Sequence, residues 1–226
     1  MKRIFTLAIS LLLCVTGGVH AQGYCFDREG QKLEYVRKYA ADGKFCWRHI
    51  LTVTEVANEG PIRRINTSSG FYKVNGKLYY KDYVLEEMQL DKDDNVQCDM
   101  ADMVRSYLKA RLGFNAVCTG GYSNIPSSVK PGDTLQSVNV IAKLGPLTYT
   151  VRIWDRKVVR EETLSVPGGT FRCIVLEEKR AETGPGHNRT IFNRTWYAKG
   201  IGYVRHDTYI KDVLDTSEIL YSISEL

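Results

Sequence analysis

Residues 157–179, KVVREETLSVPGGTFRCIVLEEK, determine the fold of this chain more directly than any other stretch. Two runs rich in Val, Thr, Ile and Phe stand on either side of Pro167-Gly168-Gly169. Such runs favour β-strands. Proline cannot donate to a sheet ladder, and glycine accepts the backbone angles of a sharp reversal. The stretch therefore predicts two antiparallel strands joined by a tight turn.

Similar turns recur along the chain. Asp42-Gly43 and Asn75-Gly76 each separate two β-rich runs, and both dipeptides are typical of hairpin turns. Further strands are expected at 33–39, 45–56, 71–74, 77–80, 83–90, 96–98, 135–144, 147–154, 190–198, 202–209 and 217–223. Serial strands with short connections indicate an antiparallel sheet rather than alternating β-α-β units.

One segment has helical spacing instead. The apolar residues that recur between Met100 and Leu112 are Met103, Val104, Tyr107, Leu108 and Leu112. Asp99 is placed to cap the start of this helix, and Gly113 is placed to end it. The sequence therefore predicts an all-β, predominantly antiparallel fold. We expect a strongly curved sheet or incomplete barrel with this one amphipathic helix packed on it.

The first 21 residues are typical of an export signal. Lys2 and Arg3 precede the apolar run 4–15, and Val19-His20-Ala21 offers small residues for cleavage. The run is shorter than the roughly 20 apolar residues that span a bilayer. We predict a signal peptide over 1–21 and a single β-rich domain over 22–226, in the periplasm or outside the cell. Anchoring through a lipid on Cys14 is an alternative, although Leu13 stands where lipoprotein signals carry a small residue.

The charge balance argues against nucleic acid as a partner. The chain carries a net charge of +5, and removal of Lys2 and Arg3 with the signal leaves +3. A chain so near neutral has no electrostatic footprint for nucleic acid. The mature chain contains no long basic block and no second long apolar stretch. No transmembrane segment is therefore expected after residue 21.

Five cysteines remain after the signal, an odd number for an oxidising compartment. Cys25 and Cys46 flank the first strand, and Cys98 and Cys118 bracket the helix, so these are the predicted disulfide pairs. Cys173 lies in an apolar strand pattern, which indicates a small buried thiol.

Catalytic and metal-binding motifs are sparse. The mature chain has three histidines at no metal-ligand spacing, and no Gly-x-Ser-x-Gly or His-Glu-x-x-His motif. Residues 91–102 match a calcium loop only in part, because Val96 stands where the turn needs glycine. No cofactor is expected, and an enzyme is the less favoured interpretation. A glycoside or ester hydrolase would need carboxylates from separate strands facing one cleft.

Aromatic residues on the predicted strands are the candidate ligand-binding residues. They are Tyr72, Tyr80, Trp154, Trp196 and Tyr203. On the concave side of a curved sheet they would form an amphipathic pocket for a lipid, a glycan or a peptide. Cross-strand aromatic pairs that hold the sheet together are the ordinary alternative.

Four motifs carry a family resemblance. They are Cys98-Asp99-Met100, Asp155-Arg156-Lys157-Val158-Val159, the run from Val166 to Cys173, and the run from Trp196 to Val204. In order and spacing the chain resembles the uncharacterised secreted TapB-like proteins of Gram-negative bacteria, a domain family of unknown function. It has Pro-Gly-Gly where Pro-Ala-Gly is commoner in that family. The resemblance implies a β-rich envelope protein, a barrel or half-barrel similar to lipoprotein-carrier folds, and supplies no catalytic residues.

Together these observations favour a non-catalytic, exported binding protein whose concave face holds an apolar or glycan ligand. The hydrolase is one alternative. A structural envelope component, whose interior is filled by its own side chains, is the other.

Overall fold

The computed structural model describes residues 23–225, which form fourteen β-strands and one α-helix. The predicted signal peptide lies outside the described residues. The helix α1 spans Met100–Leu112. The strands are β1 Gln31–Tyr39, β2 Phe45–Glu59, β3 Ile62–Tyr72, β4 Val84–Leu90, β5 Val96–Asp99, β6 Val117–Gly120, β7 Tyr122–Ile125, β8 Thr134–Leu135, β9 Val138–Leu144, β10 Leu147–Val166, β11 Gly169–Gly184, β12 His187–Ala198, β13 Gly202–Ile210 and β14 Val213–Glu225.

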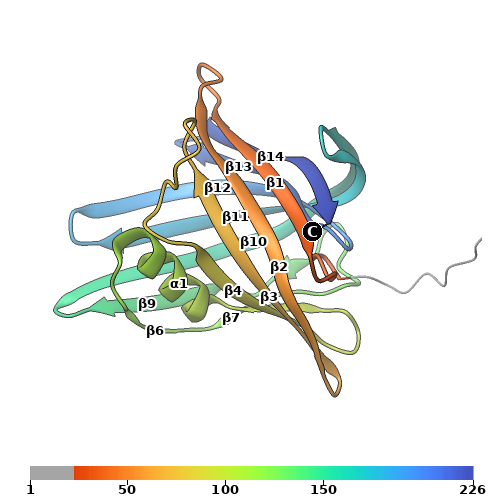
Figure 1. Cartoon of the computed structure of the whole chain (residues 1–226), viewed down its shortest axis with the longest axis horizontal. Coiled ribbons are helices and arrows are strands. Elements are labelled where there is room, and N and C mark those ends of the chain that lie inside the picture. Colours follow the sequence, from red (N-terminus) through yellow and green to blue (C-terminus); the bar gives the residue numbers. More distant parts are fainter. Residues whose placement is uncertain (1–22, 226) are drawn as a thin grey trace, which may run out of the picture.

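All the strands belong to one antiparallel sheet that curves round on itself (Figure 1). Its order is β6-β9-β10-β11-β12-β13-β14-β1-β2-β3-β4-β5-β7, with β8 beside β10. The two ends of this order, β6 and β7, are separated in sequence only by Gly121. Residues 117–125 therefore pair with β9 through their first half and with β5 through their second half. The result is a nearly closed barrel with a seam at this segment, which confirms the predicted fold class.

The hairpin predicted from residues 157–179 is present, with Val166 opposite Gly169 across its turn. Its first strand differs from the prediction, because 147–154 and 157–164 form one strand of 20 residues rather than two. A bulge between Trp154 and Lys157, where Asp155 has a φ of +52°, absorbs the irregular residues. A bulge of this kind bends a strand without ending its pairing.

Helix α1 has the predicted boundaries. The Asp99 side chain accepts hydrogen bonds from the backbone N–H groups of Ala101 and Asp102, at 2.8 and 3.1 Å. Gly113 ends the helix in the left-handed conformation, with φ of +80°. The helix packs against β4, β6 and β9, beside the seam (Figure 1). In residues 23–225 no helix is long and apolar enough to cross a membrane.

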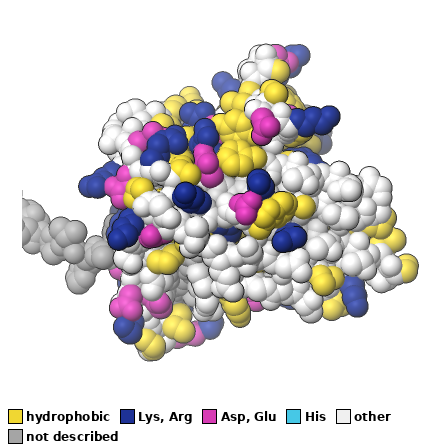
Figure 2. All heavy atoms as spheres, turned by 180° about the vertical axis from the view of Figure 1, so that it is seen from behind, with side chains coloured by type: hydrophobic (Ala, Val, Ile, Leu, Met, Phe, Trp, Pro, Cys, Tyr) yellow, Lys and Arg dark blue, Asp and Glu magenta, His cyan; other side chains and the backbone are white. Residues whose placement is uncertain are grey.

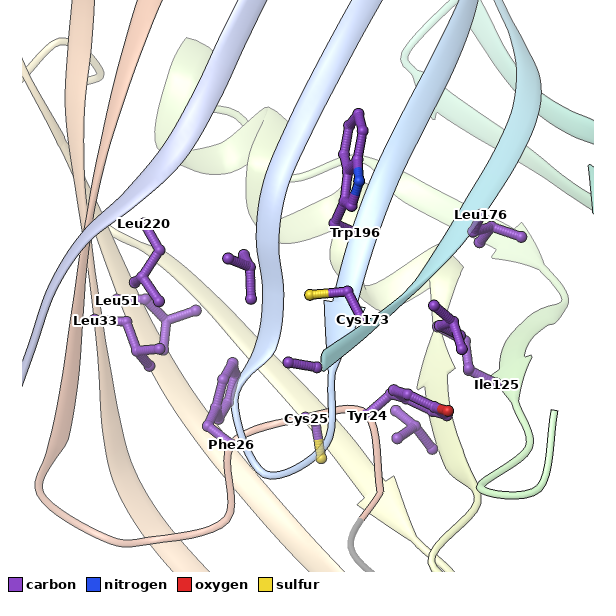
Figure 3. Packing of buried hydrophobic residues seen from close by; sticks show 14 of the residues in the cluster. Tyr24, Cys25, Phe26, Leu33, Leu51, Ile125, Cys173, Leu176, Trp196 and Leu220 are labelled. Atoms are coloured by element: carbon purple, nitrogen blue, oxygen red, sulfur yellow. The ribbon is translucent and has the colours of Figure 1, made fainter. Parts of the chain in front are cut away.

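The main hydrophobic core fills one end of the barrel. The N-terminal residues Tyr24, Cys25 and Phe26 are buried and lie across this end, below Cys173 and Leu220 in Figure 3. Cys173 is a small core residue, as its strand pattern predicted. A second cluster of small apolar side chains lies between α1 and the sheet strands β6, β9 and β10. The opposite end of the barrel is therefore not sealed by the N-terminal segment.

Arg156 closes the seam from inside the sheet. Its side chain is only 4% exposed and donates hydrogen bonds to Glu178 Oε2 on β11 (3.1 Å), Ser123 Oγ on β7 (2.9 Å) and the Gln136 carbonyl before β9 (3.0 Å). The bulge at Asp155 places Arg156 on the inner face. One guanidinium group thus ties together strands from both ends of the sheet order. Its planar, forked donors suit three acceptors at once.

The predicted disulfides are wrong, because all five cysteines in the described chain carry free thiols. Cys25 lies in the segment that closes one end of the barrel, whereas Cys46 lies beside Tyr39 at the turn between β1 and β2, at the other end. Cys98 and Cys118 do bracket α1, but the helix packs on both of their strands and the thiols stay unbonded. Burial raises the pKa of Cys25 and of Cys98 to about 12, so both remain protonated.

Replacing Arg156 by Met should destabilise the fold by about 3 kcal/mol, because Glu178 would be left as a buried carboxylate without its partner. Urea unfolding followed by circular dichroism measures the change. Arg152→Met is the matched control: Arg152 lies on the same strand, exposed over the Trp154 ring, and its loss should cost less than about 1 kcal/mol. Equal effects of the two substitutions would contradict the role given to Arg156.

Candidate functional site

A row of polar side chains crosses the inner face of five neighbouring strands. The register places Thr195 opposite His206, His206 opposite Glu218, Glu218 opposite Arg37, and Arg37 opposite Trp47. Directly opposed residues of antiparallel strands share one face of the sheet. We call these five residues the polar row. They lie between the apolar core and the end of the barrel opposite the N-terminal segment.

Glu218 is the centre of the polar row. Its carboxylate lies 3.3 Å from the Trp47 Nε1 donor, 3.4 Å from Arg37 Nη1 and 3.4 Å from His49 Nδ1. The side chain is 6% exposed, and burial alone would raise its pKa. The hydrogen bond from His49 and the nearby Arg37 charge outweigh burial and lower the pKa of Glu218 to about 2. Glu218 is therefore an ionised, fixed acceptor.

His206 is the neutral member of the polar row. Its ring nitrogens lie 2.8 Å from Thr195 Oγ1 and 3.5 Å from Thr208 Oγ1, and either nitrogen can carry the proton. Burial, followed by repulsion from Arg37, lowers the pKa of His206 to about 4. The imidazole therefore remains uncharged at neutral pH and can both donate and accept a hydrogen bond.

Stacked rings connect the apolar core to α1. Tyr203 stacks on Tyr35 at 4.3 Å between centroids, and His49 stacks on Phe71 at 4.4 Å. The Tyr203 hydroxyl and the Ser69 hydroxyl hold the two ring nitrogens of His49, at 2.9 and 3.0 Å. This arrangement fixes the imidazole in place beside Glu218.

Two further tyrosines extend the rings to the helix. The Tyr80 ring lies 5.0 Å from Phe71 and 5.3 Å from Tyr107 of α1, and the two tyrosine hydroxyls are 2.9 Å apart. Tyr80 belongs to the loop 73–83, which is attached to α1 through Lys81, whose Nζ donates to the Leu112 carbonyl at 2.8 Å. Trp47, Phe71, Tyr80 and Tyr107 all keep part of their surface accessible. An aromatic surface therefore stands next to the polar row.

A second carboxylate faces the same interior. Glu86 lies on β4, two residues before Met88, which packs against the core. Burial raises the pKa of Glu86, and His49 opposes this shift. The pKa values of Glu86 and Glu218 are thus displaced in opposite directions, and His49 acts on both.

Only two of the five predicted ligand-binding residues lie in this region. Tyr80 and Tyr203 face the interior, as described. Tyr72 points outward, with Arg48 over its ring and Tyr83 beside its hydroxyl. It borders a shallow outer cavity of about 310 Å³.

The two predicted tryptophans also face away from the polar row. Trp154 lies on the outer face of β10 beneath Arg152. Trp196 is 4% exposed, donates through Nε1 to Glu162 and is covered by the Arg205 guanidinium, 4.8 Å from its ring centroid. Its neighbour Tyr197 faces inward, opposite Tyr203.

The sequence interpretation did not single out Arg37, Trp47, His49 or Glu218. A signal was present in β1, where Arg37 falls in phase with the core residues Leu33 and Tyr35. A charged residue in phase with buried apolar ones indicates a buried ion pair.

In the segment 91–102, which matches a calcium loop only in part, candidate oxygen donors have partners within the protein. The Asp91 carboxylate accepts hydrogen bonds from the backbone N–H groups of Asp93 and Asn95, and Asp99 caps α1. Within residues 23–225 no group of three or more His, Cys, Asp or Glu side chains is placed to hold a metal ion.

Residues 28–220 match the family model described as DUF3108-like, which covers most of the barrel and the whole polar row. The chain belongs to the DUF3108-like family. No curated protein sequence matches it.

Two solved structures have a similar fold. One is a candidate exported protein with a YmcC-like fold from Bacteroides fragilis, with a TM-score of 0.73 and 21% identity over 90% of this chain and 100% of that one. The other is a candidate lipoprotein from Parabacteroides distasonis, with a TM-score of 0.74 and 17% identity over 90% of this chain and 99% of that one. At these identities the likeness concerns the fold alone.

The displaced pKa of His206 predicts a loss of stability in mild acid. Its pKa of about 4 in the folded chain lies below the ordinary value of 6.5, so the unfolded chain takes up this proton first. The contribution of His206 is therefore complete above pH 6.5 and is lost as the pH falls towards 4. His206→Asn, which keeps a hydrogen-bonding side chain, should remove about 3 kcal/mol of this pH dependence.

Urea unfolding at pH values from 7 to 4 measures this effect. His187→Asn is the matched control, since His187 is exposed at the turn between β11 and β12. A variant at His206 with an unaltered slope of stability against pH would contradict the assignment.

Proposed function

We propose that this protein is a non-catalytic binding protein, exported to the periplasm or cell exterior, that holds a glycan on the inner face of its barrel. The observation that carries the proposal is the aromatic surface next to the polar row. Accessible rings beside fixed hydrogen-bonding groups suit a sugar, whose ring faces are apolar and whose rim is polar.

An unpartnered amide supports a polar ligand over a purely apolar one. Asn193 is 2% exposed and lies on the inner face, opposite Glu178 and Thr208. Its Oδ1 atom is buried and has no hydrogen-bond partner among residues 23–225. A buried acceptor left unpaired costs about 1–3 kcal/mol. A ligand hydroxyl at this position would supply the missing donor, whereas an aliphatic lipid chain or an apolar peptide side chain would not.

Export and the finer family assignment belong to the same proposal. The predicted signal peptide and the exported and lipoprotein descriptions of the two structural neighbours support an envelope location. The four motifs that resemble TapB-like proteins support placement in that group within the DUF3108-like family.

A hydrolase is the second candidate, and the pair Glu86 and Glu218 is the observation that favours it. Displaced pKa values in opposite directions are the pattern of a general acid and an ionised partner in a glycosidase. Glu218, however, is engaged by Trp47, Arg37 and His49. This arrangement suits a fixed acceptor better than a nucleophile.

Tyr80→Ala should weaken glycan binding roughly tenfold, because the variant loses a ring of the aromatic surface. The measurement is isothermal titration calorimetry against a panel of di- to hexasaccharides, preceded by native mass spectrometry of the protein purified from its own envelope. Tyr72→Ala is the matched control, since Tyr72 lies nearby on the outer face. If neither measurement finds a ligand, the interior serves packing only and the structural interpretation replaces this proposal.

The hydrolase alternative predicts a different outcome for Glu86→Gln. A catalytic acid would make this variant lose at least about 100-fold in turnover of the oligosaccharides that bind, followed by chromatography of the products. The binding proposal predicts no turnover by either the parent chain or the variant. Measurable hydrolysis by the parent chain that is abolished in Glu86→Gln would establish the alternative.

A further inference from the structure

The turns at the end of the barrel opposite the N-terminal segment form a surface distinct from the interior site. Because the strands are antiparallel, the turns that follow β1, β3, β9, β11 and β13 lie at one end of the barrel. Three of these turns neighbour one another in the sheet, at 39–45, 73–77 and 210–213. The first is the orange loop at the top of Figure 1. We call them the three tips.

Each of the three tips exposes a large apolar side chain. Val74 is 85% exposed, Val213 is 69% exposed and Tyr39 is 48% exposed. Single exposed apolar residues are common on protein surfaces. Three on adjacent turns, with Tyr79 (47% exposed) behind them, are a group that water solvates poorly.

Lysines surround these apolar residues. They are Lys38, Lys44, Lys73, Lys77 and Lys211. The acidic residues on or beside these turns are Asp42, which pairs with Lys44 at 2.8 Å, Asp212, Asp215 and Asp82. The last turn of α1 adds Lys109 and Arg111 at this end of the barrel. The three tips are therefore basic and apolar together.

The opposite end is more acidic. Its turns carry Asp27, Glu29, Glu59, Asp91, Asp93 and Asp94, against Arg28, Lys92 and Lys199, and Asp27 and Glu59 pair there with Arg63 and Arg64. On the face shown in Figure 2, Lys and Arg side chains are interspersed with Asp and Glu side chains. The charge asymmetry is thus a property of the two ends of the barrel.

We propose that the three tips dock on a bilayer that contains anionic phospholipid. Lysines near such a surface are attracted to its headgroups, and the apolar residues between them can enter the interfacial layer. The acidic turns at the far end would then point away from the membrane. The proposal does not depend on the glycan site, because it uses residues on the turns rather than the polar row.

The test uses the mature chain and sedimentation with two kinds of vesicle, one of phosphatidylcholine alone and one with 30% phosphatidylglycerol. We expect binding to the anionic vesicles only. Lys73→Gln with Lys77→Gln should weaken it roughly 30-fold, at about 1 kcal/mol for each lysine near the surface. Val74→Asp should weaken it at least about tenfold by removing the apolar contact and adding a repelled charge.

Matched controls come from the acidic end. Ile62→Asp and Lys92→Gln make the same chemical changes there and should leave vesicle binding unaltered, with near-ultraviolet circular dichroism verifying the fold of every variant. Absence of binding to anionic vesicles would overturn the proposal and leave a protein partner as the occupant of the three tips. Equal binding to both vesicle types, or equal effects at the two ends, would also overturn it.

Discussion

The structure depends on one buried guanidinium group. A sheet of this length must either leave two open edges or return to its own beginning, and open edges invite pairing with other chains. Here residues 117–125 serve as both edges, and Arg156 joins β7, β11 and the segment before β9 across the seam. The Arg156 guanidinium is charged, is almost fully buried and donates hydrogen bonds to three acceptors. Besides it, the two sides of the seam share the chain itself, the packing of α1 and the main core, in which Ile125 of β7 and Val158 of β10 take part.

Closure of the barrel also explains why its interior is apolar at one end and polar towards the other. One end is sealed by Tyr24, Cys25 and Phe26 and is filled with aliphatic side chains, as a core requires. Towards the other end, where α1 packs on the sheet, the inward positions become polar. Glu218 and Arg37 are tolerated there because they pair with each other and are held further by Trp47, Thr208 and Thr216. A fully satisfied polar network is rigid, and rigidity is what a binding surface needs.

The sequence predicted correctly the features that depend on residues close together in the chain. The turn at Pro167-Gly168-Gly169, the cap at Asp99 and the stop at Gly113 all depend on residues close in the chain, and all three predictions are confirmed. The side of the sheet on which a residue falls depends on pairing across strands. For adjacent aromatics such as Trp196 and Tyr197, alternation guarantees that one faces inward but does not say which.

The positions of bulges and the distances between cysteines also depend on residues far apart in the sequence. The bulge at Asp155 reverses the alternation on which a face assignment for Arg156 would rest. The disulfide predictions failed because proximity in sequence says nothing of where the barrel places the two ends of a strand. The polar row could not be predicted from the sequence either, because its members come from five strands that only the fold brings together. The one indication of the polar row in the sequence was that Arg37 alternates in phase with the buried residues Leu33 and Tyr35.

The pairing of the first strand with the last has a consequence for how the chain folds. β1 lies beside β14, and Arg28 reaches Glu225, a residue 197 positions away, at 2.8 Å. Contacts of such high sequence separation slow folding. A chain that emerges from its N-terminus must keep β1 as an unpaired edge until β14 arrives, and such an edge is prone to aggregation. Escort by a holding chaperone until synthesis or translocation is complete would protect this chain at its most vulnerable stage.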